Sequence, residues 1–261
     1  MPTPADGEAA LEPTLDAFFG GAFHLHQPRH GAFRAGHDAL LVAAAVPPDF
    51  AGRAVDLGAG AGAVGFAAAA RAENLHVVLA ERNGAIAALA ERSRLLARNA
   101  ALAPRLAVAE LDVLGGRAAR EAAGLVDGGF DLVLSNPPFH PGNHRRSPHA
   151  LRDEARAAPD VDFLPEWVRA ASALLRPGGG LAMILRPENL FHIHPVMAGR
   201  LGDLRCLPIH PERDAPASRI LVSAIRGSRA PFRLLPGTVL DRNLREAVSR
   251  GTADFSQLLR R

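Results

Sequence analysis

The residue pattern that carries the most chemistry is Ser-Asn-Pro-Pro-Phe, residues 135–139, which directly follows the apolar run 130–134. The Asn136 side-chain oxygen and the Pro137 carbonyl could accept both hydrogens of an amino group on an aromatic ring. Such bonding favours a pyramidal nitrogen with an available lone pair. Pro137 and Pro138 stiffen the turn, and Phe139 offers a face for stacking a base. The motif predicts a pocket that prepares an amino group for alkylation, the alternative being a proline-rich turn with Phe139 in the core.

A glycine-rich turn follows an earlier apolar run, 54–57, and carries Gly58, Gly60, Gly62 and Gly65. Glycines allow sharp turning and close approach of a ligand to the backbone, and the next helix points its N–H groups at the turn. This pattern is typical of sites for dinucleotides and for S-adenosylmethionine. Glu81, at the end of the next strand, could bind the ribose of either ligand.

Two acidic residues bear on the choice of ligand. Asp56 precedes the glycines, where a carboxylate is unfavourable beside a pyrophosphate but suits an ammonium group and a sulfonium. It therefore favours S-adenosylmethionine over NAD. Asp112, after the third strand, could accept a hydrogen bond from the adenine amino group of the ligand. An ordinary loop or cap role is the alternative for Asp112.

Alternating strands and helices must position these residues. Apolar runs and Ala-rich helical segments alternate from residue 53 onward, which predicts a parallel sheet covered on both faces. Ligands bind at the carboxyl ends of such strands, so the glycine turn and the residue 135–139 motif should share one edge. The expected strands are 54–57, 76–80, 106–109, 130–134, 181–185, 203–207 and 218–225. The expected helices are 63–72, 84–100, 117–123, 164–175 and 188–200.

The rest of the chain divides around this core. We expect residues 1–15 to be disordered and residues 16–50 to form an N-terminal extension. That extension has a strand or hairpin over 18–27 and a helix from an Asp38 N-cap to Val46. The α/β domain that carries both motifs then covers 51–240, and 241–261 is a C-terminal tail.

Composition excludes several classes of protein. The 261 residues are 48% hydrophobic, enough for a sizeable core, and carry a net charge of +3 with arginine as every basic residue. This arginine bias can be explained by genome composition or by phosphate recognition. The single cysteine, Cys206, excludes an intramolecular disulfide. Without a signal peptide or a long apolar segment, the protein is expected to be cytoplasmic and not in a membrane. The oligomeric state stays open.

The two motifs together resemble the class I amino-methyltransferases, and their flanks narrow the resemblance. "VDLGAGAG" and "SNPPF" carry the class, while "QPRHGAFRAGHDALLVAAAVP" and "PASRILVSAIRGSRAPFRLLPGTVL" are similar to the bacterial tRNA1(Val) adenine-37 N6-methyltransferase family. The similarity covers about residues 16–240. It implies a Rossmann-like class I methyltransferase fold with a seven-stranded, mostly parallel sheet. It also implies S-adenosylmethionine as cofactor and tRNA as partner.

The resemblance also implies roles for individual residues. Gly36, His37 and Asp38 would lie beside the methionine end of the cofactor. Asp56, Gly58 and Gly60 would cradle that end, and Gly62 would complete the turn. Glu81 would hold the ribose and Asp112 the adenine. Asn136, Pro137, Pro138 and Phe139 would form the target pocket. The chain departs from the family at His37, where Thr is usual, and at Phe139, where Tyr is frequent.

Further residues extend the prediction to RNA contacts. The basic loop with His140, Arg145 and Arg146 and the C-terminal arginines Arg219 and Arg229 are candidate RNA-binding residues, the alternative being solvated surface. No metal site is expected, because His192 and His194 have no acidic or cysteine partner nearby in sequence. Alternative functions are methylation of guanine N2 in rRNA and of a protein glutamine amide. An NAD-dependent oxidoreductase and an inactive RNA-binding scaffold are more distant ones.

Overall fold

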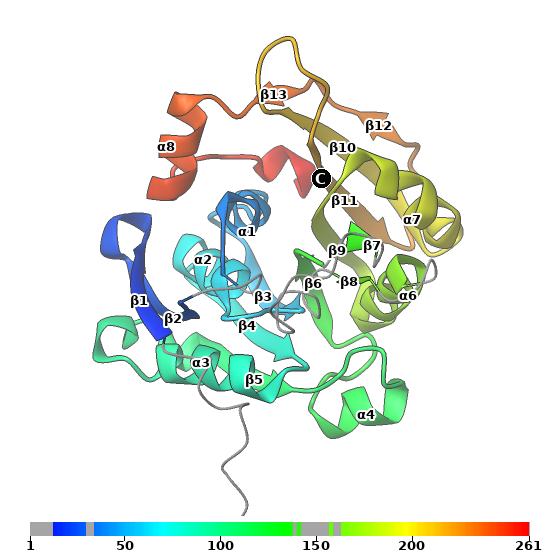
Figure 1. Cartoon of the computed structure of the whole chain (residues 1–261). Helices are drawn as coiled ribbons and strands as arrows, with labels where there is room; N and C mark the ends of the chain where they lie inside the picture. The colour runs from blue at the N-terminus through cyan, green and yellow to red at the C-terminus, as the bar shows by residue number, and fades with distance from the viewer. Residues whose placement is uncertain (1–12, 30–33, 138–139, 142–156, 159–162, 261) are drawn as a thin grey trace, which may run out of the picture.

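The computed structural model describes residues 13–29, 34–137, 140–141, 157–158 and 163–260. Its centre is one sheet with the strand order β12-β10-β11-β9-β6-β3-β4-β5, and β13 also pairs with β10. Strands β9, β6, β3, β4 and β5 are parallel, whereas β11 runs antiparallel to both β9 and β10 (Figure 1). The strands are β3 (Ala51–Leu57), β4 (Asn74–Glu81), β5 (Leu106–Glu110), β6 (Phe130–Ser135), β9 (Leu175–Leu185), β10 (Leu201–His210), β11 (Arg219–Arg226), β12 (Arg233–Leu234) and β13 (Thr238–Val239).

The predicted Rossmann-like α/β class is confirmed, and all seven expected strands are present. The short strands β12 and β13 add to them beside β10. Two further short strands, β7 (His140–Pro141) and β8 (Ala157–Ala158), pair separately from the main sheet.

Helices cover both faces of the sheet, and the sheet separates two apolar cores. One core lies beneath α1 (His37–Ala43), α2 (Ala63–Arg71), α3 (Gly84–Arg94) and α8 (Arg242–Arg250). The other lies beneath α6 (Phe163–Leu174) and α7 (Leu190–Met197), with α4 (Arg117–Ala122) near its margin. Burial of both faces explains the almost continuous apolar strands, because neither side of a parallel sheet faces water.

An N-terminal hairpin lies against α3 and ends that helix earlier than expected. It consists of β1 (Pro13–Phe18) and β2 (Phe23–Pro28), so strand structure begins inside the stretch 1–15 that we expected to be disordered. The Asn99 amide donates to the carbonyls of His24 and Ser93, each at 2.7 Å, and accepts from the His24 N–H at 2.9 Å. These bonds tie β2 to the end of α3. The expected helix 84–100 is therefore wrong beyond Arg94, where a short 3-10 turn replaces it.

The helix α1 and the C-terminal segment also differ from the expectation. Gly36, and not Asp38, is the N-cap residue. The helix α1 ends at Ala43 because the N–H groups of Ala45 and Val46 donate to the carbonyls three residues earlier, as in a 3-10 turn. Residues 241–261 are more than a tail. They contain α8 and a 3-10 turn, η5 (Ser256–Leu258), and the Phe255 N–H donates to the Ala44 carbonyl at 2.8 Å. Figure 1 shows this segment returning past α1 to the strands β10 and β11.

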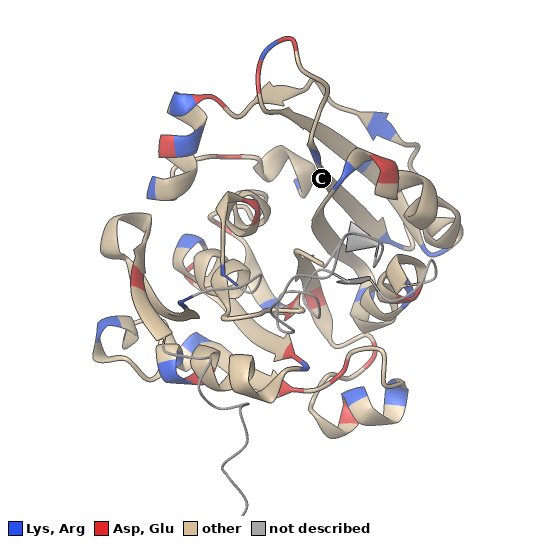
Figure 2. Ribbon diagram, in the orientation of Figure 1, with Lys and Arg blue, Asp and Glu red and all other residues tan. Residues whose placement is uncertain are grey.

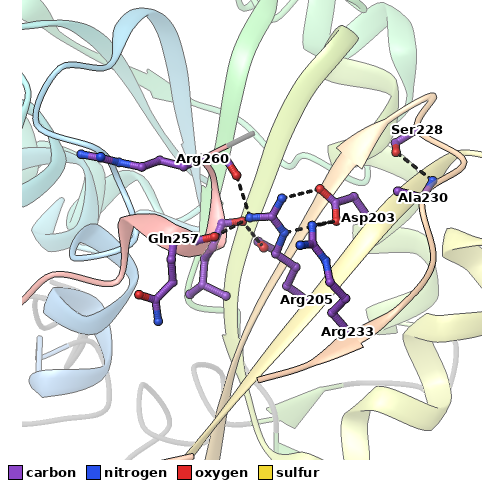
Figure 3. Close-up of polar contacts among 9 residues, drawn as sticks. Asp203, Arg205, Ser228, Ala230, Arg233, Gln257 and Arg260 are labelled. Atoms are coloured by element: carbon purple, nitrogen blue, oxygen red, sulfur yellow. Dashed lines mark hydrogen bonds and ion pairs between the residues drawn. The ribbon is translucent and has the colours of Figure 1, made fainter. Parts of the chain in front are cut away.

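A buried arginine fastens the end of this segment to β10. Arg205 binds Asp203 through Nε at 3.2 Å and through a second guanidinium nitrogen at 2.5 Å. It also donates to the carbonyls of Gln257 and Arg260, the latter at 2.7 Å (Figure 3). Arg233 completes the group by binding Asp203 Oδ1, the oxygen that also accepts from Arg205 Nε. Every nitrogen of the Arg205 guanidinium thus donates at least one hydrogen bond, which offsets the cost of burying its charge.

The remaining charges are distributed over the helices around the sheet. Figure 2 shows acidic and basic residues interspersed along these elements rather than separated onto opposite faces. Within the described ranges, no helix combines the length and apolarity needed to cross a bilayer.

Candidate active site

The glycine turn leaves β3 at the carboxyl edge of the sheet and leads into α2. Gly58, Gly60 and Gly62 have positive φ angles of 69°, 56° and 95°, which L-residues with side chains rarely adopt. The N–H groups of Gly58 and Ala59 both donate to the Ala80 carbonyl, at 2.9 and 3.0 Å. The turn is therefore held against β4, with Gly62 as the N-cap of α2.

Asp56 lies beneath this turn with its carboxylate completely buried. One oxygen accepts from the Gly65 N–H at 2.9 Å, and Oδ1 has no hydrogen-bond partner among the described residues. Burial raises the pKa of Asp56 to about 7; the Gly65 hydrogen bond opposes this rise and the charge of Glu81 adds to it. An unpaired buried carboxylate oxygen at a ligand turn fits a ligand that brings positive charge.

Glu81 braces the glycine turn from the end of β4. Its two oxygens accept from the N–H groups of Gly60 at 2.9 Å and Asn83 at 2.8 Å, and the residue is buried. A carboxylate retains further acceptor positions after two such bonds, so it can still accept from ribose hydroxyls. Asp112 follows β5 at the same edge, but its side chain is exposed and accepts from the Leu114 N–H at 2.9 Å. This is the loop-cap geometry that we set out as the alternative for Asp112.

Asn136 and Pro137 leave the sheet beside the glycine turn. Leu57 and Ser135 are register partners in β3 and β6, so the residues that follow them emerge from adjacent strands. The Asn136 side-chain Oδ1 is buried and accepts no hydrogen bond within the described part of the chain, and Pro137 is buried too. The next two motif residues, Pro138 and Phe139, lie outside the described residues.

Trp167, on the buried face of α6, contacts both loops. Its indole Nε1 donates to the Ser135 hydroxyl at 3.0 Å, and that hydroxyl donates to the Leu57 carbonyl at 2.8 Å. A Cβ placed on Gly58 would lie 3.1 Å from the indole ring, so the ring packs on the glycine turn. The helical apolar pattern gave no signal for this role, because it cannot reveal the partner of an indole N–H.

The start of α1 reaches the same edge of the sheet through an ion pair. The Arg219 Nε lies 2.8 Å from the Asp38 Oδ2. Arg219 begins β11, beside the carboxyl end of β9. Arg219, which we expected to contact RNA, therefore has an acidic partner within the protein. His37 instead contacts α8, where its Nε2 lies 3.5 Å from the Ser249 hydroxyl. Gly36 is exposed and has open space around it.

The other expected RNA contacts are not gathered at this edge. Arg229 is exposed but follows β11 at the amino edge of the sheet, opposite the glycine turn. His140 lies in β7, which pairs with β8. Arg145 and Arg146 fall outside the described residues. The described carboxyl edge thus brings together Asp56, the glycine turn, Glu81 and Asn136.

Comparison with known proteins agrees with this architecture. The methyltransferase small domain family matches residues 30–208. A predicted O-methyltransferase from Agrobacterium tumefaciens is 35% identical over 84% of this chain and 98% of its own, with a TM-score of 0.70. The T. thermophilus 16S rRNA N2 G1207 methyltransferase, solved with AdoMet and guanosine, is 20% identical over 87% of this chain and 52% of its own, with a TM-score of 0.55. No curated protein matches the sequence.

The sheet order, the antiparallel β11 and the glycine turn define a class I methyltransferase. The chain belongs to the methyltransferase small domain family. It is therefore an S-adenosylmethionine-dependent methyltransferase, as its sequence predicted.

The pKa of Asp56 predicts that cofactor binding depends on pH. Because the pKa is raised to about 7, the carboxylate that attracts a cation is a minor form at pH 6 and the major form at pH 8. We expect the affinity for S-adenosylmethionine to rise about tenfold between these pH values, measured by calorimetry. Asp56→Asn should bind more weakly and lose most of this dependence. A wild-type affinity that does not change with pH would contradict the assignment.

Proposed function

We propose that the protein transfers a methyl group from S-adenosylmethionine to the exocyclic N6 of an adenine in RNA, with adenine 37 of tRNA1(Val) as the target. The observation that carries the proposal is the buried Asn136 Oδ1, which has no partner among the described residues. Buried acceptors in native proteins are almost always hydrogen-bonded, so this atom calls for a donor from the substrate. Tied to this proposal is a cytoplasmic location, where tRNA is modified.

An amino group suits this arrangement better than a hydroxyl. The Asn136 oxygen and the backbone carbonyl of Pro137 are two acceptors, and an exocyclic amino group has two hydrogens. A hydroxyl has one hydrogen and would leave one acceptor unpaired, at a cost of about 1–3 kcal/mol. This argument favours N-methylation even though the A. tumefaciens relative is titled an O-methyltransferase.

The residues of the site would work mainly by orientation. S-adenosylmethionine supplies an electrophilic methyl group when bound. Asp56 would face its positive charge, Glu81 would accept from its ribose hydroxyls, and the glycine turn would allow its close approach. Asn136 and Pro137 would hold the amino nitrogen with its lone pair toward the methyl group. Fixed acceptors and pre-set geometry are enough to account for much of such a rate enhancement.

Guanine N2 methylation is the second candidate. Guanine also carries an exocyclic amino group with two hydrogens, and the T. thermophilus relative, of the same fold, is titled a 16S rRNA N2 G1207 methyltransferase. Glutamine side-chain amides in proteins satisfy the same two acceptors. The experiment therefore has to distinguish adenine, guanine and glutamine as the group that receives the methyl.

The test is transfer of labelled methyl groups from S-adenosylmethionine to separate tRNA, rRNA and protein fractions from a cell lacking the enzyme. Nucleoside and amino-acid mass spectrometry then identifies the product. We expect N6-methyladenosine in the tRNA fraction. N2-methylguanosine in rRNA would favour the second candidate, and methylated glutamine or a ribose-methylated nucleoside would overturn the proposal.

A further inference from the structure

A chain of contacts centred on Trp167 joins the cofactor turn to the target loop. The indole N–H donates to the Ser135 hydroxyl at 3.0 Å, and Ser135 immediately precedes Asn136. The same hydroxyl donates to the Leu57 carbonyl at 2.8 Å, and Leu57 immediately precedes Gly58. The indole ring itself packs on Gly58, within 3.1 Å of the position that a Cβ would take.

Trp167, Ser135 and Leu57 are buried in this contact chain, and Gly58 is half-buried. Ser135 is fully buried, and Trp167 is 7% exposed. The ring of Phe163, one turn earlier in α6, lies 5.2 Å from the indole, centroid to centroid. The indole therefore cannot turn away from Ser135 without moving the packing of α6. The buried indole N–H also resists separation from the Ser135 hydroxyl, because it would be left without an acceptor.

We infer that Trp167 is a positioning residue that sets the distance between the glycine turn and the Asn136 loop. Methyl transfer needs the nucleophile, the methyl group and the leaving sulfur in line, and small displacements of such groups reduce rates steeply. Trp167 contacts the Ser135 hydroxyl beside one half of the site and Gly58 in the other half, and it acts through these two residues. This inference rests on the proposed role of Asn136.

Two conservative variants interrupt the chain of contacts at different atoms. Trp167→Phe keeps an aromatic ring and removes the N–H donor, and Ser135→Ala removes the hydroxyl. We expect each to lower kcat about 10- to 100-fold. The KM and the calorimetric affinity for S-adenosylmethionine should stay within about twofold of wild type. The double variant should be no slower than the worse single variant, because both remove the same link.

Val168→Ala is the matched control. Val168 is the next residue of α6 and is fully buried in the same core, but it has no part in the link. It should lower the melting temperature at least as much as Ser135→Ala while leaving kcat unchanged. An equal loss of kcat in Val168→Ala, or unchanged kcat in Trp167→Phe and Ser135→Ala, would overturn the inference.

A spectroscopic readout keeps the inference testable if no RNA fraction is methylated, which would be a failure of the proposed function alone. Trp167 is the single tryptophan and the chain has no tyrosine, so the indole bands in near-ultraviolet circular dichroism and fluorescence report this residue alone. With S-adenosylmethionine bound, Ser135→Ala should weaken the indole dichroism, and Val168→Ala should not. Adding S-adenosylmethionine to the wild type should change its fluorescence. An indole that responds neither to Ser135→Ala nor to the cofactor would refute the positioning role.

Discussion

Replacing Asn136 with alanine should reduce methyl transfer at least about 100-fold, because it removes a fixed acceptor that acts on the reacting nitrogen. Binding of S-adenosylmethionine should not change, since the proposed partner of the Asn136 side chain is the substrate and not the cofactor. The buried position of its Oδ1 means that water cannot easily substitute for the lost oxygen. The measurement is kcat on the methylated RNA fraction, together with the calorimetric affinity for the cofactor.

Asn136→Asp is the companion variant. It retains an acceptor oxygen at the same position, so it should keep more activity than Asn136→Ala. Transfer at the wild-type rate by the alanine variant would mean that Asn136 does not bind the substrate amino group. Equal loss of cofactor affinity and kcat would instead place Asn136 on the cofactor side.

Replacing Arg205 with alanine should lower the free energy of unfolding by about 3–5 kcal/mol, because it breaks a buried ion pair and leaves partners unpaired. Arg205 binds both oxygens of Asp203 and the carbonyls of Gln257 and Arg260. The loss should be measured by denaturant unfolding. The dependence of the free energy of unfolding on denaturant concentration should be compared with that of the wild type, since an early release of the C-terminal segment would change this dependence.

Arg233→Ala provides the control, because its side chain binds the same Asp203 but is 50% exposed. Exposed ion pairs contribute about 0–1 kcal/mol, so its effect should be small. If Arg233→Ala lost as much free energy of unfolding as Arg205→Ala, then pairing the charge of Asp203 would contribute more to stability than binding the two backbone carbonyls.

The same cluster predicts how stability responds to acid. Burial acts to raise the pKa of Asp203, but hydrogen bonds and charges from Arg205 and Arg233 hold it below its ordinary value. The stabilisation is therefore present above the pKa of a free Asp and is lost as the pH falls through the lowered pKa. The wild type should lose stability in that acidic range, and Arg205→Ala should lose less there.

The sheet could be predicted from the sequence because its signals are local. Apolar runs bounded by glycine, proline and acidic residues marked all seven main strands, and parallel pairing followed from their alternation with helices. The placement of Asp56, Glu81 and Asn136 at one edge followed from the same rule.

What the sequence could not reveal depended on contacts between distant residues. Asn99 ends α3 by binding β2, and the His24 and Ser93 carbonyls that it binds are not predictable from helix propensity. Asp38 looked like a helix cap but pairs with Arg219, which lies 181 residues further along the chain. The contact of Trp167 with Ser135 is likewise invisible to a pattern that reports only apolar faces.

The bond between Phe255 and Ala44 has a consequence for how the enzyme is made. The first helix of the methyltransferase core is covered by residues that the ribosome adds only after every strand of the sheet. Until then, α1 lacks its partner α8 and the hydrogen bond from Phe255 at its C-terminal end. Closure of the apolar core beneath α1 and α2 therefore waits until residues 253–259 have been made.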